Sequence, residues 1–423
     1  MFISILLLLS VVNAELTHNE VEVITRFKPY PHRVMKFNIK GKNIKDYSYY
    51  LPLNETEMIT QLTCQKENKD IKFDVTPNTE KNRVKIQVHF EGEEEAVKFT
   101  CEHNLINALE NYPKAKGFED DYKYLATFSI CPLGKNIKCK SSIDQTSADF
   151  ISLTPEPVEK TNTKIVFDKI EKEKEFVFAI YHFSTKKEYV TYSSIKKVIN
   201  INKEDHYVHM EIEDMKNNGA ELKSEFFRED FKYGGIFLQE MKMDVEVGAS
   251  NLDYRDTTGM ITTGKLIRNE KSVTFTLPPR YPLLGGWKTS YEVNYNYPID
   301  VSVQKIGELK RFAAPLKVDL NGIVHQGEID IVLPEGATIQ SINYPKKAFI
   351  VDESYDQKSF GTYFTKPVVK LTLTDVDMST LPDTIEIYYR ENPIAERTKN
   401  IIVACLASSI ILVIILYAKI INN

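Results

Sequence analysis

The chain has 423 residues, 54 of them Lys or Arg and 59 Asp or Glu, and a formal net charge of −5. With 17 Gly, 18 Pro and 11% aromatic residues, it is neither collagen-like nor intrinsically disordered. The acidic balance argues against a nucleic-acid-binding surface, which needs excess Lys and Arg to displace counterions from the phosphates.

An apolar run at the N-terminus predicts a signal peptide. Residues 2–12 read FISILLLLSVV, which is too short to span a bilayer but suits the apolar region of a secretory signal. Val12 and Ala14 supply small residues at positions −3 and −1 of a cleavage site after Ala14. We therefore expect residues 1–14 to be a signal peptide. A buried N-terminal strand is the alternative.

One sequon and four cysteines fit the oxidising compartment that a signal peptide implies. Asn54-Glu55-Thr56 is the single Asn-x-Ser/Thr site of the chain, and it predicts an exposed acceptor at Asn54. Four cysteines outside the apolar ends form an even set with three possible pairings. The turn-prone loop between Cys131 and Cys139 favours that pair together with Cys64–Cys101, and four free, buried thiols are the alternative.

Period-two alternation of apolar and polar residues predicts β-strands along most of the chain. Long helices do not alternate with the strands, so a doubly wound α/β fold is disfavoured. Packed antiparallel sheets bury such half-apolar strands, so we expect a mainly β fold of two lumenal β-sandwich-like domains. The alternating segments are residues 35–40, 84–90, 97–102, 176–180, 208–213, 291–297, 369–373 and 385–389.

A polar stretch at residues 184–188 interrupts the apolar pattern and sets the expected domain boundary. We assign residues 15–190 to an N-terminal lumenal β domain and residues 191–390 to a second one. Residues 391–400 then form a juxtamembrane linker. Both domains are long enough to bury a core of their own.

A second apolar run near the C-terminus predicts one transmembrane α-helix. Residues 401–418 lack charge and Pro, and as a helix they are roughly 27 Å long. With a cleaved signal, the body is lumenal or extracellular and residues 419–423 form a short cytosolic tail. A GPI-attachment tail is the alternative, which Lys419 and the polar end disfavour.

Short acidic and histidine motifs offer little chemistry. His206 and His209 lie in a predicted strand, where opposite parity sends the two rings to opposite faces and disfavours a metal pair. Asp375-Val376-Asp377 is similar to the Asp-x-Asp of metal-dependent glycosyltransferases, but we interpret it as an acidic turn pair. Residues 119–121, Glu-Asp-Asp, are interpreted as a solvated loop rather than a calcium site. We predict no catalytic residue, no cofactor and no metal site.

Residues 278–298 form the most distinctive segment, PPRYPLLGGWKTSYEVNYNYP, which holds the single Trp of the chain. From composition it is interpreted as a hairpin-like corner with a buried aromatic plug. The stretch from Arg280 to Thr289 also resembles the most recognisable motif of the ribophorin I family. The residues that carry this resemblance are Arg280, Pro282, Gly285, Gly286, Trp287 and Lys288.

Further segments resemble the same family in the same order and together cover roughly residues 195–418. They are residues 218–223, 253–256 with Gly259, 331–337, and Phe360-Gly361. The N-terminal half is similar only loosely, mainly around residues 154–157. The chain stops at Asn423, as the shorter fungal-type members do, without the long cytosolic region of animal members.

The resemblance implies the single-span, non-catalytic subunit 1 of the oligosaccharyltransferase complex, in the endoplasmic reticulum membrane. That complex transfers a preassembled oligosaccharide from dolichol pyrophosphate to Asn of Asn-x-Ser/Thr in nascent polypeptides. Its implied partners are a multi-spanning catalytic subunit and small membrane subunits. The Arg280–Lys288 corner would shape either the domain core or a subunit interface. The competing interpretations are a type I adhesion or receptor ectodomain, and a membrane-anchored glycosyltransferase.

Overall fold

The structure is a computed structural model, and the predicted signal peptide (1–14) and tail (419–423) lie outside its described residues. The described residues are 16–28, 30–144, 149–161, 163–170, 175–186, 188–202, 205–227, 229, 235–269, 273–316, 322–344, 350–357, 365–378, 381–395, 401, 404–411 and 413–414.

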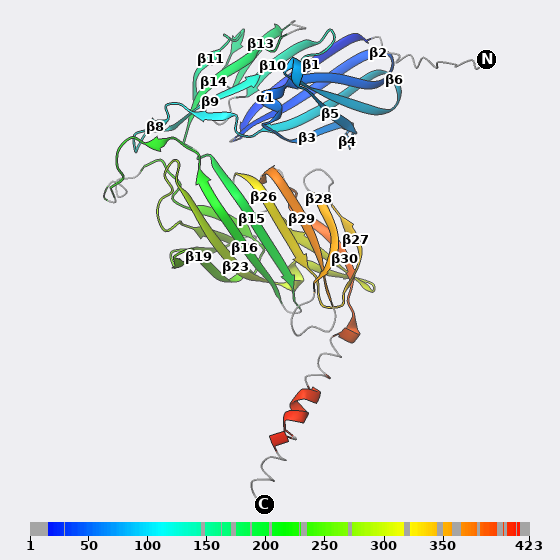
Figure 1. Cartoon of the computed structure of the whole chain (residues 1–423), viewed down its shortest axis with the longest axis vertical. Helices are drawn as coiled ribbons and strands as arrows, with labels where there is room; N and C mark the ends of the chain where they lie inside the picture. The colour runs from blue at the N-terminus through cyan, green and yellow to red at the C-terminus, as the bar shows by residue number, and fades with distance from the viewer. Residues whose placement is uncertain are drawn as a thin grey trace, which may run out of the picture. The chain divides into compact units, whose positions relative to one another are not determined.

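The chain forms two compact units, each built from β-sheets (Figure 1). Unit 1 combines Met1–Glu188 with Gly219–Ile236, and unit 2 combines Tyr189–Asn218 with Phe237–Asn423. The first change of unit, at Glu188, lies close to the expected boundary at residue 190. The segment Gly219–Ile236 was expected in the second domain but packs with unit 1, because its backbone pairs with a strand of that unit.

Unit 1 contains a large sheet and a smaller one, both defined over the described residues. The nine-stranded sheet has the order β12 (Glu159–Lys160), β13 (Lys164–Ile170), β10 (Lys138–Asp144), β1 (Leu16–Lys28), β2 (Tyr30–Pro52), β6 (Arg83–Leu105), β3 (Ile59–Lys66) and β4 (Lys69–Asp70), and β5 (Phe73–Asn78) pairs with β6. The four-stranded sheet has the order β11 (Asp149–Thr154), β14 (Phe178–Thr185), β9 (Tyr122–Ser129) and β7 (Leu109–Asn111). Two short helical turns, α1 (Leu53–Thr56) and η1 (Thr79–Lys81), connect strands of the larger sheet.

Aromatic side chains fill the space between the two sheets of unit 1. The ring of Phe27 in β1 lies 6.1 Å from that of Phe128 in β9, and 4.8 Å and 5.0 Å from those of Tyr181 and Phe183 in β14. These four side chains are buried. The two sheets therefore pack face to face as a β-sandwich, as the alternating strands predict.

One predicted strand in unit 1 buries the opposite face to that expected. The sequence pattern placed Phe176, Phe178 and Ile180 on one apolar face. In β14 the buried residues are Ala179, Tyr181 and Phe183, whereas Phe178 and Ile180 are exposed. Residues 176–183 are apolar at both parities except for His182, so alternation alone does not select the buried face.

A short parallel pair ties the segment Gly219–Ile236 to the rest of unit 1. β17 (Glu221–Leu222) pairs with β8 (Ala115–Lys116). The buried ammonium group of Lys116 donates to the carbonyl oxygens of Asp120 at 2.6 Å and Ile236 at 2.9 Å. The segment therefore supplies one of the two carbonyl acceptors of this buried lysine.

Unit 2 contains one large sheet and two small ones within the described residues. The eight-stranded sheet has the order β20 (Gly259–Met260), β19 (Ser250–Asp256), β23 (Lys288–Pro298), β16 (Asp205–Asn217), β15 (Val190–Ile201), β26 (Ile323–Val332), β29 (Lys366–Asp377) and β28 (Ile350–Gln357). One small sheet has the order β18 (Met241–Val245), β22 (Val273–Leu277) and β21 (Lys265–Arg268). The other has the order β24 (Val303–Ile306), β25 (Leu309–Pro315), β30 (Thr384–Arg390) and β27 (Thr338–Asn343). The turn η3 (Ile299–Val301) follows β23.

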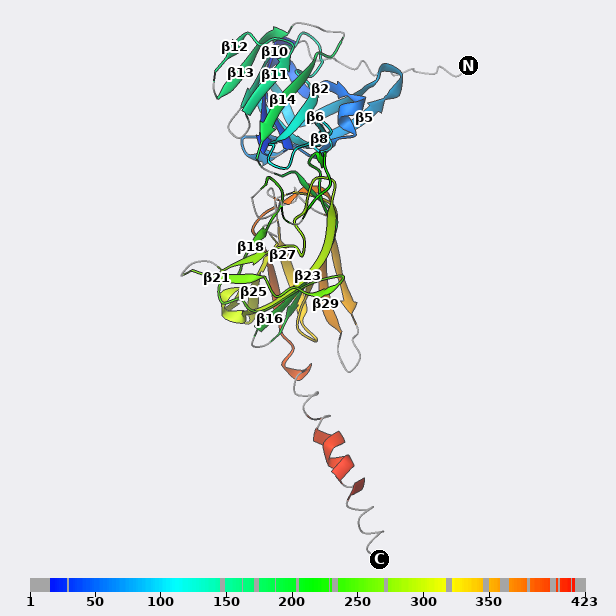
Figure 2. The same ribbon diagram turned by 90° about the vertical axis from the view of Figure 1, so that its left-hand side faces the viewer.

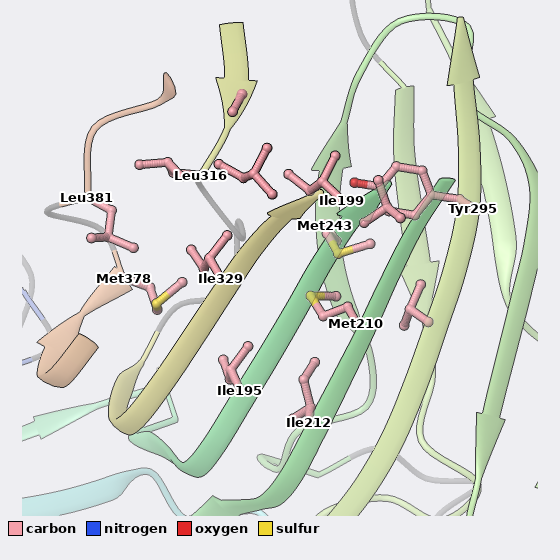
Figure 3. Packing of buried hydrophobic residues seen from close by; sticks show 14 of the residues in the cluster. Ile195, Ile199, Met210, Ile212, Met243, Tyr295, Leu316, Ile329, Met378 and Leu381 are labelled. Carbon is pink, nitrogen blue, oxygen red and sulfur yellow. The ribbon is translucent and has the colours of Figure 1, made fainter. Parts of the chain in front are cut away.

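The core of unit 2 lies between its large sheet and the small sheets. Figure 2 shows β18, β21, β25 and β27 on one side of the unit and β23 and β29 on the other. In Figure 3, Met243 of β18 lies beside Ile199 of β15 and Met210 of β16 within a single buried cluster. Val293 and Tyr295 of β23 face Met210 and Val208 of β16 in register, so the predicted tyrosine strand is buried on the expected face.

One feature differs from the expected antiparallel domains. β1 pairs with β10, and β15 with β26, in parallel, so both large sheets are mixed. Of the predicted span 401–418, residues 401, 404–411 and 413–414 are described, and they are helical. Among the residues that the structure describes, no helix has both the length and the apolar character needed to cross a bilayer.

Candidate functional site

The segment that carries the family resemblance forms a loop between β22 and β23, and Asn217 holds it in place. Asn217 ends β16 and is fully buried. Its backbone N–H donates to the Trp287 carbonyl at 3.0 Å, and its carbonyl accepts from Gly286 N at 2.8 Å. Its side-chain amide donates to the Leu283 carbonyl at 2.9 Å. One buried residue thus fixes three positions of the loop.

The Gly pair makes the tight end of this loop possible. Gly286 has a φ of 81°, which lies in the left-handed region that glycine adopts without steric cost. The following Trp287 N–H donates to the Leu284 carbonyl at 3.0 Å and closes a four-residue turn. A side chain at residue 286 would strain this turn.

A bidentate ion pair fixes the start of the loop. Arg280 Nε and Nη2 donate to the two carboxylate oxygens of Asp256 at 2.7 and 2.8 Å, and Nη2 also donates to Gly259 O at 3.1 Å. The Arg280 hydrogen bonds, helped by the backbone amides of Thr258 and Gly259, lower the pKa of Asp256 from 3.8 to about 2. Arg280 therefore ties the loop to the β19–β20 hairpin with charge-assisted bonds.

The loop buries leucines and exposes aromatic rings. Leu283 and Leu284 are buried, whereas Tyr281 is 68% and Trp287 43% exposed. The expected aromatic plug is therefore wrong, because the two leucines fill the space beneath the loop. Lys288, the first residue of β23, points to the surface, where its ammonium group lies 2.8 Å from Asp214. The outer face of the loop presents aromatic and cationic groups.

The family model described as Ribophorin I matches residues 19–418 of the chain. The chain belongs to the ribophorin I family. The match spans both units, although the sequence motifs were clear only in the second half.

Curated relatives of this family member carry the name dolichyl-diphosphooligosaccharide–protein glycosyltransferase subunit 1. Subunit 1A of Arabidopsis thaliana is 28% identical over 228 residues, which is 50% of this chain and 35% of that protein. Subunit 1 of Caenorhabditis elegans is 30% identical over 28% of this chain and 21% of its own length. Subunit 1B of Arabidopsis thaliana is 23% identical over 72% of this chain and 67% of its own length. The chain thus spans about a third or less of the first two relatives.

The structural likeness to solved proteins is distant. The M1 zinc metallopeptidase of Deinococcus radiodurans matches 48% of this ribophorin I family member and 42% of its own chain. The sequence identity is 9% and the TM-score 0.28, which is too low to bear on fold or activity.

The predicted acceptor of this family member, Asn54, lies in α1 and is exposed. Glu55, in the middle of the sequon, is buried and forms an ion pair with the buried Arg33 of β2. Burial of a charged side chain inside a sequon has no signal in the sequence.

Two disulfides lie in unit 1 of this family member. Cys64 in β3 is bonded to Cys101, its direct neighbour in β6. Cys131 is bonded to Cys139 at the start of β10 and closes the loop that joins β9 to β10. Both bonds link strands or loops of the larger sheet.

The remaining sequence motifs lie in β16, in β29 and in the loop between β8 and β9. His206 is buried, whereas His209 lies on the other face of β16 with Nδ1 2.6 Å from Asn294 Oδ1. Asp375 and Asp377 were expected in a turn but belong to β29, where Asp375 contacts His325 Nδ1 at 2.7 Å. Residues 119–121 form a loop between β8 and β9, as predicted. Within the described ranges, no group of three His, Cys, Asp or Glu is arranged to hold a metal ion.

Proposed function

We propose that this chain is a non-catalytic scaffold subunit of an oligosaccharyltransferase complex in the endoplasmic reticulum membrane. The observation that carries the proposal is the ribophorin I family match over residues 19–418. The names of the relatives, all subunit 1 of dolichyl-diphosphooligosaccharide–protein glycosyltransferases, supply the reaction. In that reaction an oligosaccharide passes from dolichol pyrophosphate to Asn of Asn-x-Ser/Thr.

The chemistry of the donor assigns the catalytic step to a partner. Dolichol pyrophosphate stays in the bilayer, so the catalytic groups belong to a multi-spanning subunit that reaches the lipid. This chain contributes two folded β units on the lumenal side and holds the partners together. The nascent polypeptide passes nearby as the acceptor.

The topology in this proposal is single-pass type I. The apolar N-terminal run, with small residues before the cleavage site, supports a signal peptide at residues 1–14. The uncharged residues 401–418 support one membrane span. Small residues along this segment suit close packing against helices of the small membrane subunits; they are Ala404, Ala407, Ser408 and Ser409.

The loop before β23 is the proposed subunit interface in unit 2. Tyr281 and Trp287 are large and exposed, and aromatic side chains of this kind anchor protein interfaces. Asn217 and the Arg280–Asp256 pair hold the loop in one conformation, so little ordering remains to be done when a partner binds.

Co-purification with single variants tests the interface. We expect Trp287→Ala to lose partner subunits from the tagged full chain while the β units keep their melting temperature. Ile267→Ala, which removes an exposed apolar side chain from β21, is the matched control and should retain the partners. Full partner retention by Trp287→Ala would contradict the interface.

Glycan transfer to an Asn-x-Thr peptide tests the function itself. Removing the tagged chain from a detergent extract should remove transfer activity, and the purified chain alone should have none. Transfer by the isolated chain would contradict a non-catalytic role. Labelling of the chain on the surface of intact cells would instead support an adhesion or receptor ectodomain.

A further inference from the structure

The sequon at Asn54 lies in a helical turn that is anchored at both ends. α1 joins β2 to β3, and the N–H of its first residue, Leu53, donates to the Asn82 carbonyl at 3.2 Å. Just after it, Ile106 N–H donates to the Met58 carbonyl at 2.8 Å. The Asn54 side chain points to the surface. The backbone on either side of it, however, is hydrogen-bonded to the residues just outside the two ends of β6.

The hydroxyl group of the sequon is occupied inside the turn. Thr56 Oγ1 lies 2.6 Å from the Pro52 carbonyl and 3.0 Å from the Leu53 carbonyl, to which it donates. The hydroxyl is the feature shared by Asn-x-Ser and Asn-x-Thr, so an enzyme that reads the motif must contact it. In the folded turn this contact competes with the intramolecular hydrogen bonds.

The middle residue of the sequon is buried between the two sheets. Glu55 pairs with Arg33 Nη1 of β2, and its second carboxylate oxygen accepts from Ser129 N of β9 at 2.9 Å. Arg33 Nη1 also donates to Ser129 Oγ at 3.2 Å. These residues are buried, and Arg33 Nε and Nη2 have no hydrogen-bond partner among the described residues. Glu55 therefore supplies the counter-charge of a buried arginine.

An enzyme that binds all three residues must lift them from the protein. Lifting the turn would remove Glu55 from between the sheets and leave Arg33 buried without its carboxylate. Such an opening is a local unfolding of unit 1 and is rarely populated. Before unit 1 folds, the same three residues lie in a chain that opposes no such movement.

We propose that Asn54 carries an N-linked glycan attached before α1 docks, and that folding of unit 1 then closes the sequon. The donor is a lipid-diphosphate-linked oligosaccharide. The sugar C1–O bond to the diphosphate breaks, the C1–N bond to Asn54 Nδ2 forms, Nδ2 loses a proton, and the lipid diphosphate leaves. The exposed position of Asn54 then leaves the glycan in solvent while Glu55 and Thr56 take their folded contacts. The inference needs only that the chain enters the lumen, whether or not it is an oligosaccharyltransferase subunit.

Acceptor assays on the full chain test the order of events. Unglycosylated chain, made in cells depleted of the lipid-linked donor, is offered to purified oligosaccharyltransferase with the lipid-linked oligosaccharide. The folded chain is compared with chain that has been reduced and alkylated, and mass spectrometry of the Asn54 peptide gives the rates. We expect the unfolded chain to react at least about tenfold faster, because modification of the folded chain follows its open population.

Variants next to Asn54 separate the effect of the buried Glu55–Arg33 pair from the effect of the sequon itself. Glu55→Ala keeps the sequon and should raise the rate of the folded chain toward that of the unfolded one. Glu57→Ala, which removes an exposed acid two residues after Glu55, is the matched control and should leave the rate unchanged. If Glu55→Ala does not fold, the comparison of the glycosylation rates of folded and unfolded wild-type chain still tests the proposal. Equal rates in that comparison, or an unmodified Asn54 in chain from ordinary cells, would overturn the proposal.

Discussion

His206 makes the stability of unit 2 depend on pH, and His206→Phe should remove most of that dependence. The buried ring packs edge-on against Tyr297 and Phe312, with centroids 4.8 and 5.2 Å away. Neither ring nitrogen has a hydrogen-bond partner among the described residues. Burial lowers the pKa of His206 from 6.5 to about 4.

The sign and size of the effect follow from this pKa difference. Between about pH 6.5 and 4 the unfolded chain binds a proton at His206 that the folded chain does not, so acidification favours unfolding. The contribution of neutral His206 to the stability of unit 2 is fully present above about pH 6.5 and is lost as the pH falls toward 4. In full it amounts to about 3 kcal/mol, of which about 2 kcal/mol is lost between pH 7.5 and 5.

Tryptophan fluorescence measures this effect in unit 2 alone. Trp287 is the single Trp of the chain and lies in unit 2. Urea unfolding of the full chain in detergent at about pH 7.5 and 5 gives the two free energies of unfolding. The wild-type loss should exceed that of His206→Phe by about 2 kcal/mol. His209→Gln, on the other face of β16, is the matched control and should retain the wild-type loss. An equal loss in wild type and His206→Phe would refute the reasoning.

Three further perturbations test contacts that position the described sites. Glu55→Ala leaves Arg33 buried without its counter-charge and should destabilise unit 1 by about 3–5 kcal/mol. Arg33→Met combined with Glu55→Leu should recover most of that stability. Hydrogen exchange in β2 and β9 measures both effects, and unchanged exchange in Glu55→Ala would contradict the role of the buried Glu55–Arg33 pair. Asn217→Ala removes the amide donor to the Leu283 carbonyl and should lower the free energy of unfolding in urea by about 1–3 kcal/mol. An unchanged free energy of unfolding would show that the loop keeps its conformation without this hydrogen bond. A chain truncated at the expected domain boundary lacks Gly219–Ile236, and it should melt lower than the same chain with that segment appended through a flexible linker. Equal melting temperatures would mean that β17 adds nothing to unit 1.

The strands could be predicted because their signal is local. Side chains alternate across a strand, so the pattern at residues 291–297 already gives the buried face of β23. The same signal gave the wrong face for β14, because both parities are apolar there. Parallel pairing of β1 with β10, and the return of Gly219–Ile236 to unit 1, depend on contacts between distant residues that a single sequence does not encode locally.

The candidate site was only partly predictable for a similar reason. The resemblance at Arg280–Lys288 located the loop, and the structure shows its tight backbone at Gly286. Composition could not decide whether Trp287 or its leucine neighbours would be buried, since all are apolar and adjacent. Likewise, Glu55 reads as a solvated acid in the sequence, and only the three-dimensional meeting of β2, β9 and α1 shows that it is buried.

The central claim is that this chain works as a subunit beside a catalytic partner. Mass spectrometry of the tagged full chain, purified in mild detergent from its own cells, tests it most directly. The account predicts that the chain is recovered with a multi-spanning membrane protein and small membrane subunits, in a complex that transfers oligosaccharide to an Asn-x-Thr peptide. Recovery of the chain alone, or only with copies of itself and without transfer activity, would contradict the account.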